Sequence, residues 1–170
     1  MSAEAAKIMG RGFFQTVGQD DLLPEFQPVL DSGWTVVNGA ILLKGWYESY
    51  FGERSRFLET IDYEVSVNGR GIPDLDLAEA REARVPMLLR RGVAFAWAAL
   101  HVQRSQLPDA KMAAYISAAP TLVDPDYFTG NVTFCAQRPG QLPYIEPERL
   151  TEEIVAALFT EDCEKPLSVS

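Results

Sequence analysis

Apolar and polar positions alternate most regularly in residues 60–67. Ile61, Tyr63, Val65 and Val67 are separated by Thr, Asp, Glu and Ser residues. Strict alternation is typical of a β-strand with one buried face, so we predict a strand here. Asn-Gly at 68–69 favours a turn, and we expect residues 70–73 to run back as a short second strand.

Three further segments predict strands. Residues 34–44 contain two apolar runs separated by Asn38-Gly39, which favours a type I′ hairpin turn. The apolar run 112–119 lies between Pro108 and Pro120, and its length favours a buried strand. Residues 132–137 alternate again and predict another strand.

Helices are predicted at both ends and in the middle of the chain. Residues 2–9 are rich in alanine and precede a glycine. The Asp76–Glu79 spacing matches a capping box, so a long helix is expected to begin there and run towards Leu107, with a kink or break near Pro86. Leu150, Ile154 and Leu158 recur every four residues and predict a C-terminal amphipathic helix.

This order of elements predicts an α+β fold in a single domain spanning residues 1–170. We expect a mainly antiparallel sheet, with the long central helix packed on one face and the C-terminal helix beside it. Residues 1–33 are interpreted as an N-terminal arm and wrapped segment, 34–160 as the α+β core, and 161–170 as an acidic tail that frays.

Composition supports an ordinary soluble domain and removes some partners. The chain has 170 residues, of which 47% are hydrophobic, so a core can form without disulfides or metals. A net charge of -9 argues against a broad nucleic-acid surface. No apolar stretch is long enough to predict a membrane span. Two cysteines without CxxC spacing are typical of a reduced, cytoplasmic protein.

A single histidine, His101, restricts the catalytic chemistry that the chain can offer. Ser-His-Asp and Cys-His sites need a positioned imidazole, and His101 has no nucleophile motif around it. Asp124 and Asp126 are expected in a plain turn, and Glu59, Asp62 and Glu64 on a solvated strand face. We therefore predict no catalytic residue, no metal ligand and no cofactor.

The long helix carries one cationic-aromatic stripe. At 100° per residue, Arg90, Trp97, His101 and Arg104 fall along one side, while Leu88, Phe95, Ala99 and Val102 form the core-facing side. These four stripe residues are the candidate partner- or ligand-binding site, because Trp and Arg are frequent interface anchors. In the alternative interpretation, which we favour, Trp97 packs under the sheet and the arginines pair with the protein's own surplus acidic residues.

The favoured function is a non-catalytic protein-interaction or assembly module, an accessory subunit that binds a protein partner or associates with itself as a homo-oligomer. The alternative is a small intracellular enzyme or small-molecule-binding protein with a pocket between sheet and long helix. An acidic tail over residues 146–164 would suit a basic partner surface.

Overall fold

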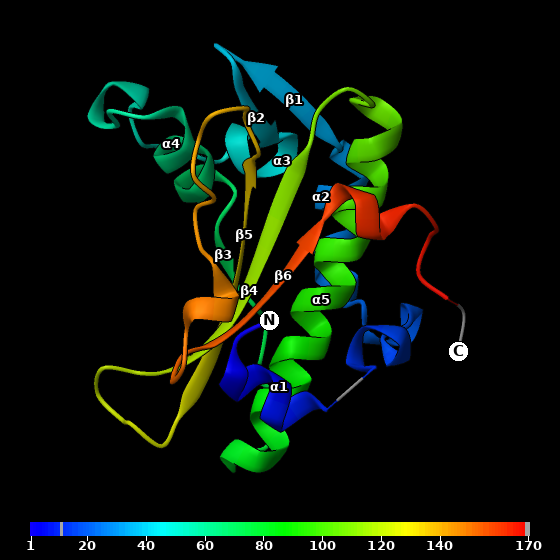
Figure 1. The fold of residues 1–170 in the computed structure, drawn as a ribbon, viewed down its shortest axis with the longest axis vertical. Helices are drawn as coiled ribbons and strands as arrows, with labels where there is room; N and C mark the ends of the chain where they lie inside the picture. Colours follow the sequence, from blue (N-terminus) through cyan, green and yellow to red (C-terminus); the bar gives the residue numbers. More distant parts are fainter. Residues whose placement is uncertain (11, 169–170) are drawn as a thin grey trace.

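A four-stranded antiparallel sheet and one long helix form the centre of the computed structural model, which describes residues 1–10 and 12–168 (Figure 1). The sheet order is β3-β5-β4-β6. Its strands are β3 (Arg70–Gly71), β4 (Met112–Pro120), β5 (Phe128–Ala136) and β6 (Ile154–Phe159). Helix α5 (Arg81–Gln106) packs on one face, so the predicted α+β, single-domain fold is confirmed.

Strands β4 and β5 form a hairpin that is paired over its whole length, from Met112 opposite Ala136 to Pro120 opposite Phe128. Both strands were predicted. The apolar run of β4 is continuous because both of its faces are buried. Ala114 and Ile116 belong to the main core, whereas Ala113 and Tyr115 belong to a smaller cluster on the opposite face.

Helix α5 approaches the sheet closely at Gly92. A Cβ atom at this position would lie 2.5 Å from Cγ2 of Ile116 and 2.7 Å from Cδ1 of Ile72. The helix continues without interruption through Pro86, and begins at Arg81. The prediction that it starts at the capping box was wrong, because the Asp76 carboxylate binds the Arg91 guanidinium.

Residues 60–67 form helix α4 (Thr60–Val67), so the predicted strand was wrong. The same pattern also contains two pairs of apolar residues four positions apart, Ile61 with Val65 and Tyr63 with Val67. A helix places these two pairs on nearly opposite sides. Ile61 and Val65 pack against the cluster on the outer sheet face, whereas Tyr63 and Val67 are buried beneath the N-terminal hairpin. The helix lies between two apolar clusters, and this requires apolar residues on two sides.

The predicted C-terminal helix was also wrong, because residues 154–159 form the edge strand β6 against β4. Apolar residues four positions apart fit a strand equally well. Side chains of a strand return to the same face every two residues, so residues four apart share a face. Ile154, Ala156 and Leu158 face the main core, and Ala157 and Phe159 the outer cluster. Pro147 begins a 3-10 turn, Pro147–Arg149.

The predicted hairpin at 34–44 is confirmed as β1 (Trp34–Val37) and β2 (Ala40–Leu43), which pair antiparallel. Asn38 and Gly39 have φ values of 49° and 80°, as a type I′ turn requires. The short helices are α1 (Ala3–Met9), which was predicted, α2 (Gln27–Ser32) and α3 (Lys44–Glu48). The short strand β3 pairs with β5, not with residues 60–67.

Three buried polar side chains complete the outer edge of β5, which β3 covers only in part. The Arg84 guanidinium donates to the Phe128 carbonyl, the Asn68 amide donates to the Phe134 carbonyl, and the Glu64 carboxylate accepts from the Ala136 amide. Between them, the Ile72 amide donates to the Gly130 carbonyl. Side chains from α4 and α5 therefore take the place of a missing strand.

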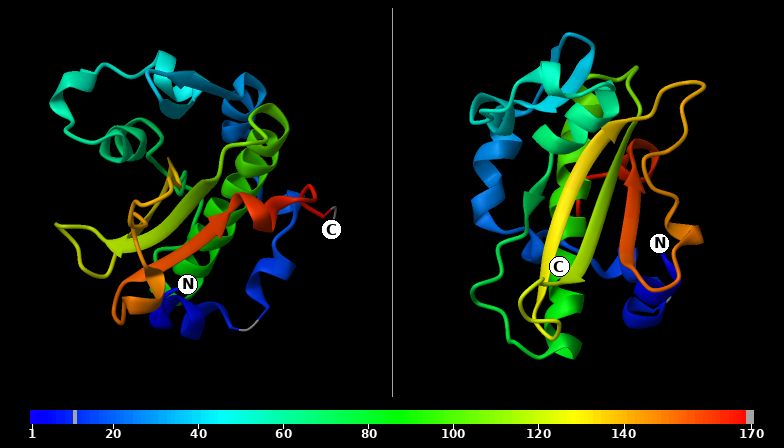
Figure 2. Two further views of the ribbon diagram at one scale, coloured as in Figure 1. Left: turned by 45° about the horizontal axis from the view of Figure 1, so that its top comes forward. Right: turned by 90° about the vertical axis from the view of Figure 1, so that its left-hand side faces the viewer.

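The N-terminal residues lie beside the edge strand β6, where the Ser2 amide donates to the Val155 carbonyl, and the C-terminal segment lies on the side of α5 away from the sheet (Figure 2). The 3-10 helix Thr160–Cys163 follows β6, and Leu167 is buried. The predicted tail 161–170 is thus described as far as 168, and its fraying stays a prediction. None of the described helices has the length and apolar character needed to cross a membrane.

Candidate interaction sites

The four predicted site residues lie on the outer side of α5, with side chains that are only partly exposed. The opposite side of the helix faces the sheet, and Leu88, Phe95 and Ala99 are buried there as predicted. Val102, which was predicted with them, is only half-buried and lines a groove on the outer side of the helix. The four stripe residues therefore share one side of α5, as predicted. The contacts that each side chain makes determine its role in the free chain.

Three stripe residues hold successive residues of the C-terminal segment. Nε1 of Trp97 donates to the Lys165 carbonyl over 2.8 Å, and Nδ1 of His101 lies 3.0 Å from the Cys163 carbonyl. The ring donates this hydrogen bond to the carbonyl when Nδ1 carries a proton. Arg104 pairs with Glu164, with 3.0 Å between Nη2 and Oε1. All three contacts fall within residues 163–165, where the chain leaves the 3-10 helix Thr160–Cys163.

Arg90 binds the N-terminal segment instead. Its Nε and Nη2 atoms lie 2.7 Å from the two carboxylate oxygens of Asp21, a bidentate pair. The same guanidinium donates to the Thr16 carbonyl over 2.7 Å. Both stripe arginines thus pair with the protein's own acidic residues. Partner binding by the stripe stays a prediction.

A groove of about 610 Å³ runs beside the stripe, between α5, the N-terminal segment and the C-terminal segment. Its walls are mainly apolar, and its polar side chains are Gln19, Gln27, Asp31 and His101. The groove lies on the side of α5 away from the sheet. The alternative function predicted a pocket between the sheet and the long helix. The side chains of Leu88, Phe95 and Phe134, which are fully buried, fill that space.

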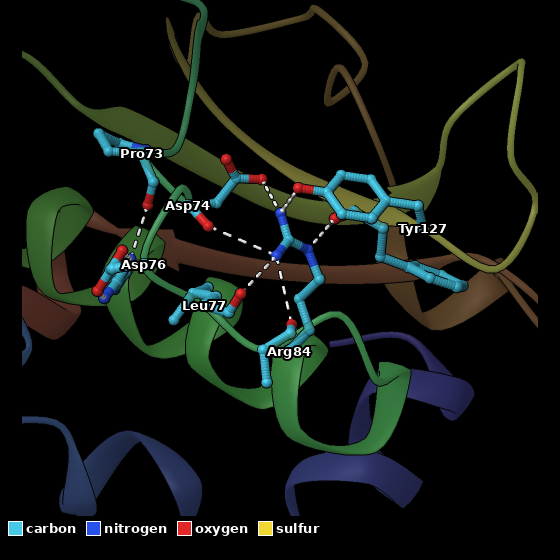
Figure 3. Close-up of polar contacts among 9 residues, drawn as sticks. Pro73, Asp74, Asp76, Leu77, Arg84 and Tyr127 are labelled. Carbon is cyan, nitrogen blue, oxygen red and sulfur yellow. Dashed lines mark hydrogen bonds and ion pairs between the residues drawn. The ribbon is translucent and has the colours of Figure 1, made fainter.

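A second site, not predicted from the sequence, is built around Arg84 (Figure 3). This side chain is 1% exposed, and its guanidinium donates to the Asp74 carboxylate and, over 2.6 Å, to the Tyr127 hydroxyl. It also donates to the backbone carbonyls of Leu77 and Ala78. One buried cation therefore fixes both loop 73–80 and loop 121–127 against the first turn of α5.

Arg91 lies two helical turns after Arg84 in α5 and also holds loop 73–80 in place. Its guanidinium donates to the Pro73 carbonyl over 2.8 Å and forms a bidentate pair with Asp76. The hydrogen bonds from Arg91 lower the pKa of Asp76 from 3.8 to about 2. The loop is held at both Asp74 and Asp76.

The tips of these two loops present apolar side chains to solvent. Leu75 is 99% exposed, and Leu122 and Val123 are similarly exposed. Loop 121–127 is ordered by its own hydrogen bonds, because the Asp124 carboxylate accepts from the Asp126 amide over 2.9 Å. The predicted turn role of Asp124 is therefore confirmed. We call this end of the molecule the loop surface, formed by residues 73–80 and 121–127.

Glu64 was predicted on a solvated face, and this was wrong, because its side chain is fully buried. Its carboxylate forms a bidentate pair with Arg138, with Oε1 2.6 Å from Nη2 and Oε2 2.9 Å from Nη1. It also accepts from the amides of Ile41 and Ala136. The carboxylate joins α4, the β1–β2 hairpin and β5, so its role is structural. Asp62 is exposed, as expected.

The sequence contained a signal for the Arg84 site. Arg84, Leu88, Arg91 and Phe95 are spaced four, three and four apart, so the two arginines share the core-facing side of the helix with Leu88 and Phe95. A buried arginine needs paired acceptors. That spacing could have directed attention to the aspartates of the preceding loop.

Within residues 1–10 and 12–168, no group of three or more His, Cys, Asp or Glu side chains is arranged to hold a metal ion. Cys135 and Cys163 are both buried free thiols, and burial raises the pKa of each to about 12. No protein-family model, no curated protein and no solved structure matches this chain.

Proposed function

We propose that this chain is a non-catalytic protein-interaction module that docks a partner through its loop surface. The observation that carries the proposal is the Arg84 guanidinium, which binds Asp74 in one loop and Tyr127 in the other while the neighbouring apolar tips stay exposed. Large apolar side chains exposed on ordered loops are typical of binding sites.

The rigidity of the loops favours binding. Ordering a flexible loop at an interface costs conformational entropy, and this cost lowers affinity. Buried hydrogen bonds to Arg84 and Arg91 hold the backbone of loop 73–80 before any partner arrives. Leu75 and Leu122 are therefore presented in a preorganised arrangement, which lowers the entropic cost of binding.

The charge of the loop surface indicates the kind of partner. Its two loops carry five acidic residues and no lysine or arginine. Arg84 and Arg91 of α5 neutralise Asp74 and Asp76, which leaves the negative charges of Glu79, Asp124 and Asp126. A basic protein surface with an apolar centre complements this pattern. Two copies of the loop surface would repel each other, so the proposed partner is a different protein. Self-association through another face stays a prediction, which light scattering tests.

A paired set of variants tests the loop surface. The full chain is immobilised as bait, a captured protein is identified and purified, and its affinity is measured by isothermal titration calorimetry. Leu75→Asp with Leu122→Asp should weaken binding at least about 100-fold, as loss of two hot-spot residues does. The matched control is Leu58→Asp with Leu142→Asp, which changes two other exposed leucines. Equal affinity of both double variants would refute the proposal.

A second candidate function, binding of a small molecule, is supported by the groove beside His101. Its volume of about 610 Å³ and its mix of apolar walls with a few polar side chains suit a small ligand. The test is a fragment screen followed by NMR, in which shifts should cluster around the groove. Val102→Trp, which fills the groove, should abolish them, while fragments that bind both proteins equally argue against this function.

A further inference from the structure

We infer that the outer side of α5 is a second protein-binding site, one that accepts a short peptide segment of a partner in place of the chain's own residues 163–168. This inference does not depend on the loop surface. It rests on the way in which the free chain fills the site.

The site holds its occupant mainly through the peptide backbone. Trp97 and His101 contact the carbonyls of Lys165 and Cys163, and the Gln19 amide donates to the Ser168 carbonyl over 3.0 Å. Gly18 and Ser168 also form a parallel β-bridge. The segment is therefore bound between a helix face and a strand-like edge. Such contacts accept many sequences, because every residue carries the same carbonyl.

Two side chains of the occupant add sequence preference. Glu164 pairs with Arg104, and Leu167, three positions later, is buried. Between them, Lys165 and Pro166 are exposed. The preferred ligand is thus a short segment with an acidic residue at a turn, followed three positions on by an aliphatic residue.

The groove gives a partner segment contacts that the chain's own tail does not make. It continues beside Pro166 and Leu167 along α5, where Leu22, Leu23 and Val102 form its apolar walls. A partner segment with additional apolar residues can bury them there. This gain offsets the advantage of the tethered tail, whose effective concentration is in the millimolar range.

The site is therefore self-covered, and binding of a partner requires release of the tail. Tail release exposes the indole of Trp97 and the imidazole of His101, the residues that the sequence singled out. The two interpretations of the stripe are then two states of one surface: it packs against the tail in the free chain and binds the partner in the complex.

The test uses a fluorescein-labelled peptide with the sequence of residues 160–168, with Ser in place of Cys163, and the full chain. Peptide affinity is measured by fluorescence anisotropy for three proteins: the wild type, Leu167→Asp and Glu164→Lys. Both substitutions weaken the tethered tail and leave the site intact. We expect Leu167→Asp to bind the peptide at least about tenfold more tightly than the wild type does, because competition by the tail is reduced. Glu164→Lys, which loses an exposed ion pair, should bind it about two- to fivefold more tightly.

Three controls make the result specific. Adding Trp97→Ala to Leu167→Asp should abolish peptide binding, and a peptide with Asp at the Leu167 position should not bind. Glu164 is exposed, so Glu164→Lys keeps the fold even if the Leu167 variant does not. The loop-surface double variant should bind the peptide as the wild type does, which separates failure of this inference from failure of the proposed function.

Alkylation of the buried thiol of Cys163 by iodoacetamide reports whether the tail is released. Released tails without any gain in peptide binding would refute the inference, because the site would then not accept a segment in trans. Unchanged protection in both variants would also refute it, since Glu164 and Leu167 would not anchor the tail. A wild-type dimer that exchanges tails, detected by light scattering with tagged copies, would assign the site to a second copy of this chain instead.

Discussion

The guanidinium carbon of Arg84 lies 4.1 Å from the centre of the Tyr127 ring, and the same group donates a hydrogen bond to the Tyr127 hydroxyl. Stacking and hydrogen bonding to one side chain join the helix α5 to loop 121–127. Because the same Nη2 atom also donates to the Asp74 carboxylate, the position of loop 73–80 depends on this guanidinium as well.

Arg84→Met should lower the free energy of unfolding by about 3–5 kcal/mol, because it leaves a carboxylate and several backbone carbonyls without their buried donor. Tyr127→Phe removes only one hydroxyl and should cost about 1 kcal/mol. Urea denaturation measures both. A loss below about 1 kcal/mol in Arg84→Met would show that the loops do not depend on this side chain.

The Glu64–Arg138 pair can be tested with a double-mutant cycle. Glu64→Gln should destabilise the fold by about 3 kcal/mol, because a buried guanidinium edge loses its charged partner. Arg138→Met should cost a similar amount, and the double variant should cost less than the sum of the two. Additive losses would mean that the two side chains act independently.

Asp76 should give part of the stability an acid dependence. Its folded pKa of about 2 lies below the ordinary value of 3.8, so its contribution is present above the ordinary value and is lost as pH falls through the folded pKa. Urea unfolding at several values between about pH 5 and pH 2 measures this loss. Asp76→Asn should show a smaller decrease across that window, and an unchanged decrease would contradict the assignment.

The two cysteines should be unreactive in the folded protein. Burial raises the pKa of both thiols to about 12, so the nucleophilic thiolate is scarce at neutral pH and is also inaccessible. Iodoacetamide should modify neither Cys135 nor Cys163 in buffer and both in concentrated urea, as mass spectrometry would show. Rapid labelling of Cys163 alone in buffer would indicate that the C-terminal segment opens spontaneously.

Gly92→Ala should destabilise the protein although alanine favours helix. The added Cβ would lie 2.5 Å from the Ile116 side chain, so α5 must move away from the sheet or the isoleucine must shift. We expect a net loss of about 1–3 kcal/mol by thermal denaturation, because overpacking exceeds the gain in helix propensity. Ser105→Ala, at an exposed position of the same helix, is the matched control and should be nearly neutral.

Local pattern was sufficient where one element has one consistent periodicity or a specific turn. The β1–β2 hairpin follows from Asn38-Gly39, since these residues adopt positive φ more readily than others. Strands β4 and β5 follow from their apolar runs, and α5 follows from its length and its apolar faces. The stripe on α5 was located correctly because helical geometry fixes which residues share a side.

The same reasoning failed for α4 and β6, which exchanged their predicted structures. Apolar residues four apart fit a helix face and also one face of a strand, so periodicity alone cannot separate the two for short segments. In α4, both sides of the helix meet apolar clusters, and in β6, both faces of the strand are buried. Neighbours distant in sequence supplied that burial.

By itself, then, the sequence determined the α+β class, the β1–β2 hairpin and the long helix. It also determined the side of that helix on which the Arg and Trp residues of the stripe lie, because all of these depend on local geometry and composition. Only the tertiary structure decided what each polar group meets. Arg84, Asn68 and Glu64 bind the open edge of β5, and the C-terminal segment covers Trp97 and His101. Such pairings join residues about 40 to 75 positions apart, and chain folding alone brings them together.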